Sequence, residues 1–330
     1  MSKKSVLIIG GAGYIGSHVT LEFCEAGYKV FVFDDLSTGH LKNIDDRAEF
    51  IEGSILNIDQ LQLAFEKTEP DTVIHLAALK DAGESMLQPD KYSRHNINGT
   101  VNILEMMVKF GVRNMIFSSS AAVYGMPEYL PLDENHPLKP INYYGYTKLV
   151  VENMLAWYSG LKNIRYAALR YFNAVGYDPL GRITGIERNP ANLLPIIMET
   201  INGERKAIEI FGDDYNTDDG TCERDYIHVS DLATAHLRSA EYLMINKENL
   251  ITNLATGKRH SVLDVIKICE KVIDNKIPYK IGGRRIGDAP IVYSKSINSE
   301  NLFNWSPQYT SFPEVIKSMV EVYSNKFISV

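Results

Sequence analysis

Short apolar runs alternate with segments of helical spacing through the first half of the chain. The apolar run at 5–9 ends at a group of glycines, and apolar residues at 14–26 then recur at helical spacing before Gly27, a residue that commonly ends a helix. A second apolar run follows at 29–33. Together these segments predict a β-α-β unit of about thirty residues.

The alternation continues beyond this first unit. We expect further strands at 50–51, 72–76, 114–117 and 164–169, and helices at 58–67, 92–110 and 143–159. Strands that alternate with helices are typical of a parallel sheet with helices on both faces. The sequence therefore predicts an α/β protein built on a doubly wound parallel sheet.

The pattern changes in the second half of the chain. Gly, Pro, Asn and Asp become frequent at 178–190 and 212–220, and a helical segment at 193–202 lies between these stretches. Regular spacing returns in the strand expected at 225–229 and the helix expected at 230–246. We therefore expect a first domain of residues 1–175, to which the chain returns around 225–250, and a smaller C-terminal α/β substrate lobe formed mainly by residues 176–330.

Composition and charge exclude several classes of protein. The 330 residues are 45% apolar and 23% charged, values of an ordinary globular protein rather than of a collagen-like or disordered chain. The net charge of −7 and the lack of a basic tract argue against a nucleic-acid partner. No segment approaches the roughly 18 apolar residues of a membrane span, so we expect no membrane association.

The cysteines provide no pattern for a disulfide framework or a metal site. Cys24, Cys222 and Cys269 are scattered along the chain, without pairs at metal-ligand spacing. We therefore expect no bound metal and a cytoplasmic location.

A glycine-rich segment joins the first predicted strand to the first predicted helix. Gly10, Gly13 and Gly16 form the pattern G-x-x-G-x-x-G, in which glycines permit a tight turn and let backbone amides approach a pyrophosphate. A tight turn with no ligand would look the same. Asp34, at the end of the second strand, favours the ligand, because its carboxylate can accept hydrogen bonds from ribose hydroxyls and would repel the 2′-phosphate of NADP. The sequence thus predicts an NAD site.

Ser120, Tyr144 and Lys148 form a second group of candidate residues. Tyr144 and Lys148 are four positions apart in a predicted helix and so share one face, while Ser120 follows a strand whose C-terminal edge is where ligands bind in such sheets. A free tyrosine has a pKa of about 10, but a nearby ammonium and a cationic nicotinamide would favour its phenolate. We expect Tyr144 to act as a base and Ser120 to hold the reacting oxygen. Tyr143 has Thr147 as its own i+4 neighbour and lacks such a cation.

These features resemble the extended short-chain dehydrogenase/reductase family. Within that family, the sequence is similar to the enzymes that epimerise UDP-glucose and UDP-galactose at C4, over residues 5 to about 320. The segments that carry this resemblance are Asp34–Gly39, Val73–Lys80, Gly83–Ser85, Asn96–Thr100, Ser118–Gly125, Leu169–Asn173, Gly212–Tyr215, Asp219–Thr221, Arg224–Val229 and Ser261–Val265.

The resemblance implies a Rossmann-type NAD-binding domain, a UDP-sugar substrate and a homodimer joined through the helices at 92–110 and 143–159. The catalytic set that it implies is Ser120, Tyr144 and Lys148. The implied NAD site comprises Gly10, Gly13, Tyr14, Ile15, Gly16, Asp34, Ser54, Ile55, Leu76, Ala77, Lys80, His95, Tyr144, Lys148 and Phe172. The implied UDP-sugar site comprises Lys80, Ser120, Tyr144, Asn173, Asn192, Leu193, Ile210, Phe211, Arg224, Arg285, Asp288 and Val292.

Several positions depart from the family's usual pattern. Ser54 stands where an Asp is usual and His95 where an Asn is common, which leaves the adenine and ribose contacts at these positions open. Ala122 replaces a usual Thr, Asp81 follows Lys80 where a small apolar residue is usual, and the loop at 184–191 is shorter than usual and less acidic.

Val292 bears on which sugars the site accepts. Related enzymes with Tyr at the corresponding position exclude 2-acetamido sugars, whereas those with a small residue admit them. The valine therefore predicts that UDP-N-acetylglucosamine is accepted beside UDP-glucose. Two alternatives stay open: Val292 is ordinary apolar packing, or a register slip of one residue makes Tyr293 the residue that limits the pocket.

Two other functions share parts of this pattern. A nucleotide-sugar 4,6-dehydratase of the same family needs an Asp-Glu pair directly after the active-site hydroxyl residue, and here Ala121 and Ala122 follow Ser120. A non-catalytic NAD sensor would need neither Tyr144 nor Lys148. We therefore expect an NAD-dependent UDP-hexose 4-epimerase that acts through a 4-keto intermediate.

Overall fold

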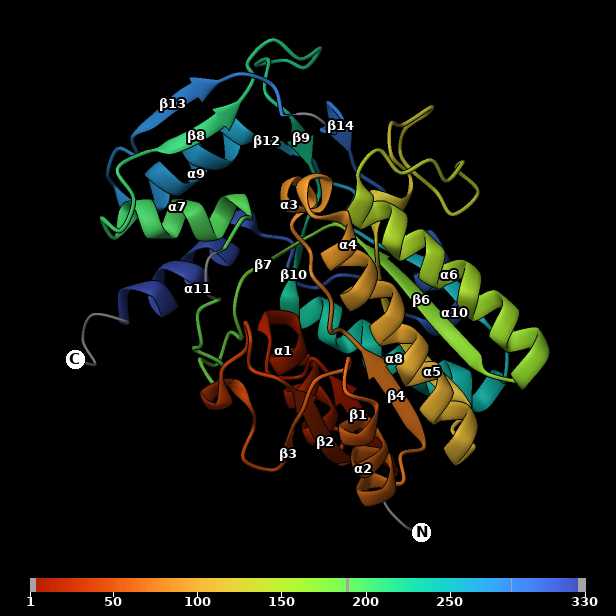
Figure 1. Cartoon of the computed structure of the whole chain (residues 1–330). Coiled ribbons are helices and arrows are strands. Elements are labelled where there is room, and N and C mark those ends of the chain that lie inside the picture. Colours follow the sequence, from red (N-terminus) through yellow and green to blue (C-terminus); the bar gives the residue numbers. More distant parts are fainter. Residues whose placement is uncertain (1–3, 188–189, 286, 326–330) are drawn as a thin grey trace.

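A parallel sheet forms the centre of the molecule (Figure 1). The computed structural model describes residues 4–187, 190–285 and 287–325. Within these ranges the main sheet has seven strands, and each pair of neighbours runs parallel. Their order across the sheet is β11 (Leu250–Leu254), β6 (Arg165–Tyr171), β5 (Asn114–Ser120), β4 (Thr72–His75), β1 (Ser5–Ile9), β2 (Lys29–Asp34) and β3 (Glu49–Glu52).

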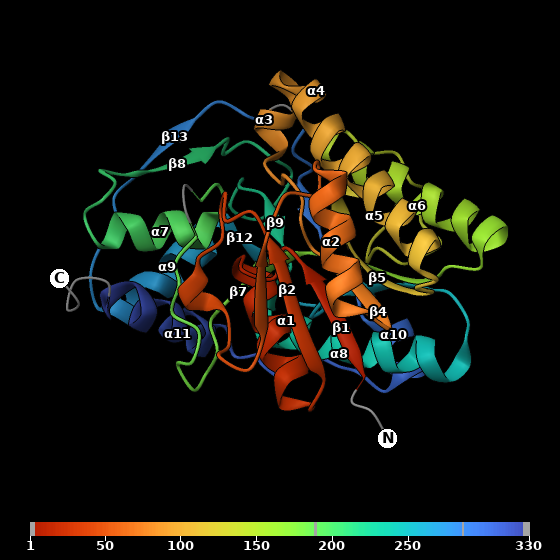
Figure 2. The ribbon, with the colours of Figure 1, turned by 60° about the horizontal axis from the view of Figure 1, so that its bottom comes forward.

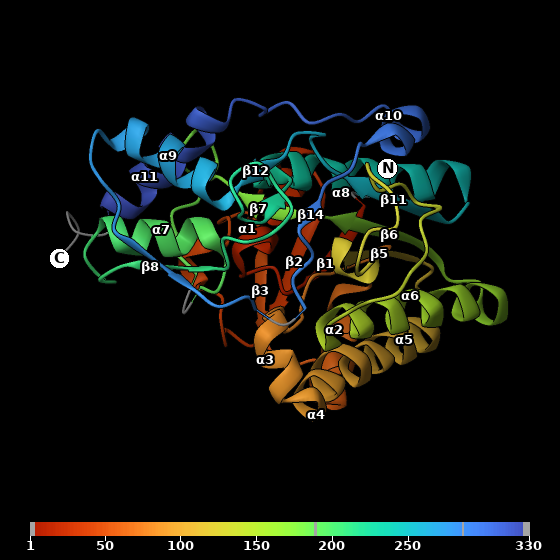
Figure 3. The same cartoon turned by 90° about the horizontal axis from the view of Figure 1, so that it is seen from above.

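The central strands are buried on both faces, which explains their continuous apolar runs. In β1, Val6 and Ile8 point into one hydrophobic cluster, and Leu7 and Ile9 point into another on the opposite face. Figure 3 shows the resulting layers, with the sheet between two groups of helices. One face is covered by α1 (Tyr14–Glu25) and α8 (Val229–Asn246), and the other by α2 (Ile58–Thr68), α5 (Gly99–Phe110) and α6 (Tyr143–Lys162).

The helix expected at 92–110 is present and contains a π-helical segment. Helix α3 (Ala82–Leu87) and helix α4 (Pro89–Tyr92) are followed by a π-helical segment, Ser93–Asn98, and only then by α5. Asn96 lies in the π-helical segment, where its side chain accepts a hydrogen bond from Leu79 N and donates to Leu79 O and to Thr147 Oγ1. π-Helical segments occur frequently at functional sites, and this one ties the loop after β4 to helix α6.

A second, smaller group of elements lies to one side of the sheet (Figure 2). Its apolar core contains side chains of α7, α9 and α11 together with residues of β8. The elements of this lobe are α7 (Leu193–Ile201), β8 (Ile208–Phe211), β9 (Glu223–Arg224), β12 (His260–Ser261), α9 (Val262–Ile273), β13 (Tyr279–Gly282), β14 (Ile291–Val292) and α11 (Phe312–Asn325).

The chain passes between the two groups more than once. Strand β7 (Asn173–Val175) pairs in parallel with β10 (Tyr226–His228), and α8 and β11 then return to the main sheet before α10 (Ile297–Phe303) packs beside α8 and β11. The fold is thus the expected Rossmann-type doubly wound sheet with a smaller C-terminal α/β lobe. The domain boundary near residue 175 remains a prediction.

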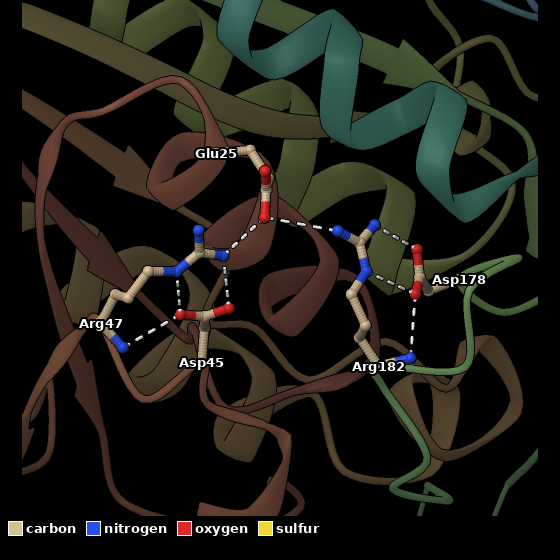
Figure 4. A network of polar contacts seen from close by, with 5 residues as sticks. All are labelled: Glu25, Asp45, Arg47, Asp178 and Arg182. Atoms are coloured by element: carbon tan, nitrogen blue, oxygen red, sulfur yellow. Dashed lines mark hydrogen bonds and ion pairs between the residues drawn. The ribbon is translucent and has the colours of Figure 1, made fainter.

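A polar network attaches the segment after β7 to the N-terminal half (Figure 4). Asp178 accepts two hydrogen bonds from the side chain of Arg182. The same guanidinium lies 3.4 Å from Glu25 at the end of α1, and Glu25 also pairs with Arg47 at 2.7 Å. The segment that follows, up to Glu187, reaches the candidate site described below.

No helix in the described ranges is long and apolar enough to cross a membrane. Arg188 and Asn189 of the loop at 184–191, and Ile286 beside Arg285, lie outside the described residues.

Candidate active site

A cavity of about 790 Å³ opens at the carboxyl ends of the strands of the main sheet. Its lining contains most of the residues that the sequence assigned to NAD: Gly10, Gly13, Tyr14, Ile15, Gly16, Asp34, Ile55, Leu76, Ala77, Lys80, His95, Tyr144 and Lys148. Ser54 and Phe172 are not part of this lining. The volume is in the range of about 300–1,000 Å³ that is usual for ligand pockets.

The glycine-rich turn fits a pyrophosphate. Gly10 has a φ of +87°, and a β-carbon there would lie 2.6 Å from Ala77 N, while a β-carbon at Gly16 would lie 2.0 Å from Gly10 O. At Gly13, however, the nearest atom to such a carbon is 3.4 Å away. Gly10 and Gly16 therefore permit close backbone packing, whereas Gly13 leaves room on the side of the cavity.

Helix α1 begins at this turn without a side-chain cap. Its N-cap residue is Gly13, which has no side chain that could accept a hydrogen bond from the first turn of the helix. By contrast, Asn57 caps α2 and Asn142 caps α6. The uncapped amides and the positive end of the helix dipole make this helix start suited to an anionic group.

Asp34 lines the cavity at the end of β2. Its carboxylate accepts hydrogen bonds from Ala12 N at 3.0 Å and from Leu36 N at 2.8 Å. Burial raises the pKa of Asp34, and these backbone hydrogen bonds act in the opposite direction. An ionised carboxylate has about four acceptor positions, so two remain for ribose hydroxyls. The residues present thus fit NAD.

Tyr144 and Lys148 both line the cavity, but the pKa of Tyr144 is raised, whereas the sequence predicted that a nearby ammonium would favour its phenolate. Burial raises the pKa of Tyr144, and its hydrogen bond with Ser120 is the opposing influence. Burial also lowers the pKa of Lys148 to about 7, against the charge of Glu152, which raises it. The Lys148 ammonium lies 5.7 Å from the centre of the Tyr144 ring. The protein groups alone therefore favour the neutral phenol, and further positive charge in the cavity is needed to ionise it.

The start of helix α6 aims Tyr144 and not Tyr143 at the cavity. Asn142 caps the helix by accepting from Gly145 N, and Ser85 Oγ accepts from Tyr144 N at 3.0 Å. The hydroxyl of Tyr143 instead lies 2.7 Å from Ser93 Oγ, away from the cavity lining. Ser120, at the end of β5, accepts from Ala122 N and hydrogen-bonds Tyr144.

Several lining residues were not predicted from the sequence. One of them is Glu187, which comes from the segment after β7 and has a side chain that is 12% exposed. It forms an ion pair with Lys80, a residue that was predicted. Glu84 pairs with Lys91 at 2.7 Å on the same side of the cavity. No sequence signal joins Lys80 to a carboxylate 107 positions later, because only the tertiary fold brings them together. Asp81, noted in the sequence beside Lys80, also lines the cavity, and further lining residues that were not predicted include Asp35, Ser37, Thr38, Tyr92, Ser118, Tyr171 and Ala191.

The residues assigned to the UDP-sugar lie mostly in the smaller lobe, outside the lining of this cavity. The carboxylate of Asp288 lies 3.0 Å from Arg285 and 3.9 Å from Arg224. The Arg285 guanidinium lies over the ring of Phe211, 5.2 Å from its centre. Asn192 is the N-cap of α7, and Leu193 and Ile210 belong to the apolar core of the lobe.

Two contacts connect these residues to the segment around Phe172. Asn173 directly follows Phe172 and donates a hydrogen bond to Asp225 O at 3.0 Å, beside Arg224. Val292 pairs in register with Arg224 and packs in the same apolar cluster as Phe172 and Ala121.

Val292 and Tyr293 point to different neighbours. Val292 packs against an apolar cluster that includes Phe172 and Ala121, the residue that follows Ser120, whereas the ring of Tyr293 lies under the guanidinium of Arg259, 5.6 Å from its centre. Successive residues of an extended strand point to opposite sides, so only one of the two can face the catalytic set. No group of three His, Cys, Asp or Glu residues suited to a metal ion occurs within the described ranges.

Comparisons with known proteins agree with this geometry. The sequence profile of the NAD dependent epimerase/dehydratase family matches residues 6–255. The UDP-glucose 4-epimerase of Halalkalibacterium halodurans is 42% identical over 318 residues, which are 96% of this chain and 93% of that protein. The crystal structure of UDP-glucose 4-epimerase from Brucella ovis in complex with NAD is 39% identical, with a TM-score of 0.93 over 97% of this chain and 98% of that one.

The name of a third relative includes an N-acetylated sugar. The structure of the UDP-Glc/GlcNAc 4-epimerase from Campylobacter jejuni is 36% identical, with a TM-score of 0.84 over 98% of this chain and 100% of that one. The glycine-rich turn, the Tyr144 and Lys148 pair and these full-length similarities lead to one conclusion: the chain belongs to the NAD dependent epimerase/dehydratase family.

Proposed function

We propose that the protein interconverts UDP-glucose and UDP-galactose by epimerisation at C4 and binds NAD as its cofactor. The observation that carries this proposal is that a single cavity contains both the uncapped start of α1 at the glycine-rich turn and the Tyr144 and Lys148 pair. A nucleotide site and a proton-transferring pair in one cavity suit a reaction in which hydride and proton move together. Relatives that share the full length of the chain are UDP-glucose 4-epimerases, one of them solved with NAD.

Each group of this chain has a defined task in the reaction. Tyr144, as phenolate, removes the proton of the sugar 4-hydroxyl, and Ser120 holds that oxygen by a hydrogen bond. The Lys148 ammonium stabilises the phenolate. When bound, NAD supplies a reversible hydride acceptor for C4, so that a 4-keto sugar forms and is reduced on its other face.

Arginine side chains of the smaller lobe anchor the nucleotide while the sugar turns over. Arg224 and Arg285 present planar guanidinium groups that match pyrophosphate oxygens better than an ammonium does. Asp288 holds both arginines near one another. Because the anchor is on the nucleotide, the sugar itself stays free to rotate between hydride transfers.

The proposal is tested by the state of the cofactor. Purified protein should contain bound NAD, and addition of UDP-glucose without external cofactor should give both UDP-galactose and a small absorbance of reduced nicotinamide. Protein that is stripped of NAD and still epimerises would contradict the proposal. UDP-glucose turnover that produces a dehydrated sugar would favour the dehydratase.

We also propose that the site accepts UDP-N-acetylglucosamine. The support is the packing of Val292 against the apolar cluster that contains Phe172 and Ala121, the residue after Ser120. The Campylobacter jejuni relative is named for both kinds of sugar.

We further infer a homodimer that forms through α5 and α6 and a cytoplasmic location. Large apolar side chains are exposed along α6, where Trp157 is 71% and Leu161 69% exposed, and Val108 is exposed on α5 beside it. Such a patch is typical of an interaction site. The molecular mass in solution tests the dimer, and Trp157→Glu should shift it towards that of the monomer.

The inferred cytoplasmic location is supported by the cysteines. Cys24, Cys222 and Cys269 are buried and form no disulfide, which suits a reducing compartment.

A further inference from the structure

A buried ion pair lies behind the catalytic residues and outside the cavity lining. Glu152 on α6 and Arg170 on β6 have side chains that are 4% and 3% exposed. Arg170 donates to both carboxylate oxygens, from Nε at 2.9 Å and from Nη2 at 2.6 Å. Mutual attraction does not by itself recover the cost of removing two charges from water, so a buried pair is weak evidence for added stability. Its neighbours indicate a different role.

Glu152 lies one helical turn after Lys148 on the same face of α6. Lys148 Nζ donates a hydrogen bond to Ser118 O at 2.7 Å, and Ser119 Oγ donates one to Glu152 Oε1 at 2.5 Å. Two successive turns of α6 therefore hold two successive residues of β5. The next residue of that strand is Ser120, so this pair of contacts sets the distance between α6 and the catalytic end of β5.

Arg170 connects the same carboxylate to two further strands. Its Nη1 donates to Tyr124 OH at 3.1 Å, and that hydroxyl donates to Asn253 Oδ1 on β11 at 2.7 Å. Tyr171, the next residue of β6, hydrogen-bonds Ser118 and lines the cavity beside Lys148. Glu152 is thus the point where α6, β5 and β6 are joined.

The charged and titratable groups around Lys148 come from three elements. Helix α6 contributes Tyr144 and Glu152, strand β6 contributes Arg170 and Tyr171, and strand β4 contributes His75. Burial lowers the pKa of His75 to about 3 and raises that of Tyr171, so both are neutral near pH 7. Glu152 is the group whose charge raises the pKa of Lys148.

We propose that Glu152, held by Arg170 and Ser119, is a positioning residue for the reaction, which keeps the Lys148 ammonium charged and aligned with Tyr144. The inference rests on the proposed function, because it takes Lys148 as the cation beside the catalytic tyrosine. Burial brings the pKa of Lys148 down to about 7 even with the carboxylate in place. Without that negative charge the amine would lose its proton at a lower pH, and Tyr144 would lose its cationic neighbour.

The first test measures the titration of Lys148 directly. NMR of the NAD-containing protein labelled at the lysine ε-carbons, with Lys148→Arg to assign the signal, reports its pKa in the wild type and in two variants. Glu152→Gln keeps the shape and the acceptor for Ser119 but removes the charge, so it should lower the pKa by about one unit. Arg170→Gln leaves the carboxylate unneutralised and should raise it. The pKa of Lys148 should thus move in opposite directions in the two variants. An ion pair that only stabilises the fold would not produce this result.

The second test uses the pH profile of kcat. Activity needs the charged lysine, so the alkaline limb should move to lower pH in Glu152→Gln and to higher pH in Arg170→Gln. At pH 8 the Glu152→Gln variant should lose about tenfold in kcat, with KM for UDP-glucose and NAD content nearly unchanged, because the residue contacts neither ligand. Glu128→Gln, which removes a carboxylate from the exposed ion pair with Lys139, is the matched control and should leave the profile in place.

The proposal would be overturned if the pKa of Lys148 stayed at its wild-type value in both variants, or moved in the same direction in both. This holds whatever the thermal stability of the variants. If one single variant does not fold, the double variant Glu152→Gln/Arg170→Gln is compared with the single variant that does: a Lys148 pKa below that of Arg170→Gln, or above that of Glu152→Gln, supports the proposal, and an equal value refutes it. If the wild type does not epimerise UDP-glucose, the proposed function fails, while the NMR titration still decides whether Glu152 controls the charge of Lys148.

Discussion

The two halves of the candidate site are built in different ways. On the side of the main sheet, the cavity is formed by a tight glycine turn, helix amides and side chains that are buried or fixed by backbone hydrogen bonds. On the side of the smaller lobe, the anchoring groups are side chains: Arg285 is 41% exposed, and its geometry depends on one carboxylate, Asp288. Backbone positions are set by the fold, whereas exposed ion pairs rearrange readily and contribute little to stability.

This difference matches the different demands on the two ligands in the proposed reaction. A cofactor that is regenerated in every turnover gains from a rigid and preorganised site, while a substrate that must enter and leave gains from side chains that adjust. Substitutions on the first side should therefore affect cofactor content or chemistry, and substitutions on the second should affect KM or sugar choice. The predictions below test that division.

The largest effect is expected at Tyr144. Tyr144→Phe removes the general base and leaves the cavity shape intact, so kcat should fall by about 10²–10⁴-fold while UDP-sugar affinity changes only a few-fold. Steady-state kinetics together with UDP binding by calorimetry measure the two quantities. Tyr143→Phe is the matched control, because its hydroxyl contacts Ser93 outside the cavity lining. Equal losses in both variants would show that the wrong tyrosine has been chosen.

The next largest effect separates two glycines of one turn. Gly16→Ala places a β-carbon 2.0 Å from Gly10 O, so the backbone must shift, and we expect a loss of about 3 kcal/mol or more in stability and protein that contains no NAD. Gly13→Ala meets only an atom 3.4 Å away. It should keep its melting temperature within about 2 °C but bind NAD about tenfold more weakly, because Gly13 lines the cavity and an added methyl group competes there with the cofactor for space. Melting curves and NAD content distinguish the two, and a stable NAD-containing Gly16→Ala protein would contradict this account.

A smaller effect is expected at Arg285 in the other half of the site. Arg285→Gln removes a charge-assisted contact worth about 1.5–3 kcal/mol, so KM for UDP-glucose should rise by about 10- to 100-fold. NAD content and kcat should stay close to the wild-type values, because the residue lies outside the cavity lining. Arg284→Gln, which breaks an exposed pair with Asp214, provides the comparison. A loss of bound NAD in Arg285→Gln would contradict the proposal that this half of the site binds the substrate and not the cofactor.

The smallest and most selective effect concerns sugar choice. Val292→Tyr adds side-chain volume next to the apolar cluster of Ala121 and Phe172, so epimerisation of UDP-N-acetylglucosamine should fall by at least about tenfold, while UDP-glucose turnover changes by less than about threefold. Tyr293→Val is the control, because Tyr293 contacts Arg259 on the other side of the strand. Both substrates are assayed with each variant. A wild type that is inactive on the acetylated sugar would refute this prediction.

The sequence alone determined the order of the elements and the main features of the cavity. Periodic apolar residues and turn-forming glycines act over a few positions, so the strands at 72–76 and 164–169 and the glycine-rich turn were placed within a few residues of β4, β6 and the start of α1. The spacing of Tyr144 and Lys148 likewise put both on one helical face. These features depend on local geometry, which neighbouring residues suffice to define.

The tertiary structure alone decided the charges and contacts around those residues. The ion pair of Lys80 with Glu187, the approach of Asp288 to Arg224 and the π-helical segment at Asn96 all depend on partners that are brought together from different elements. The pKa of Lys148 fell to about 7 because burial outweighs the charge of Glu152. Burial and Coulomb interactions act through space, so a pattern read along the chain predicts which groups titrate but not the environment that sets their charge.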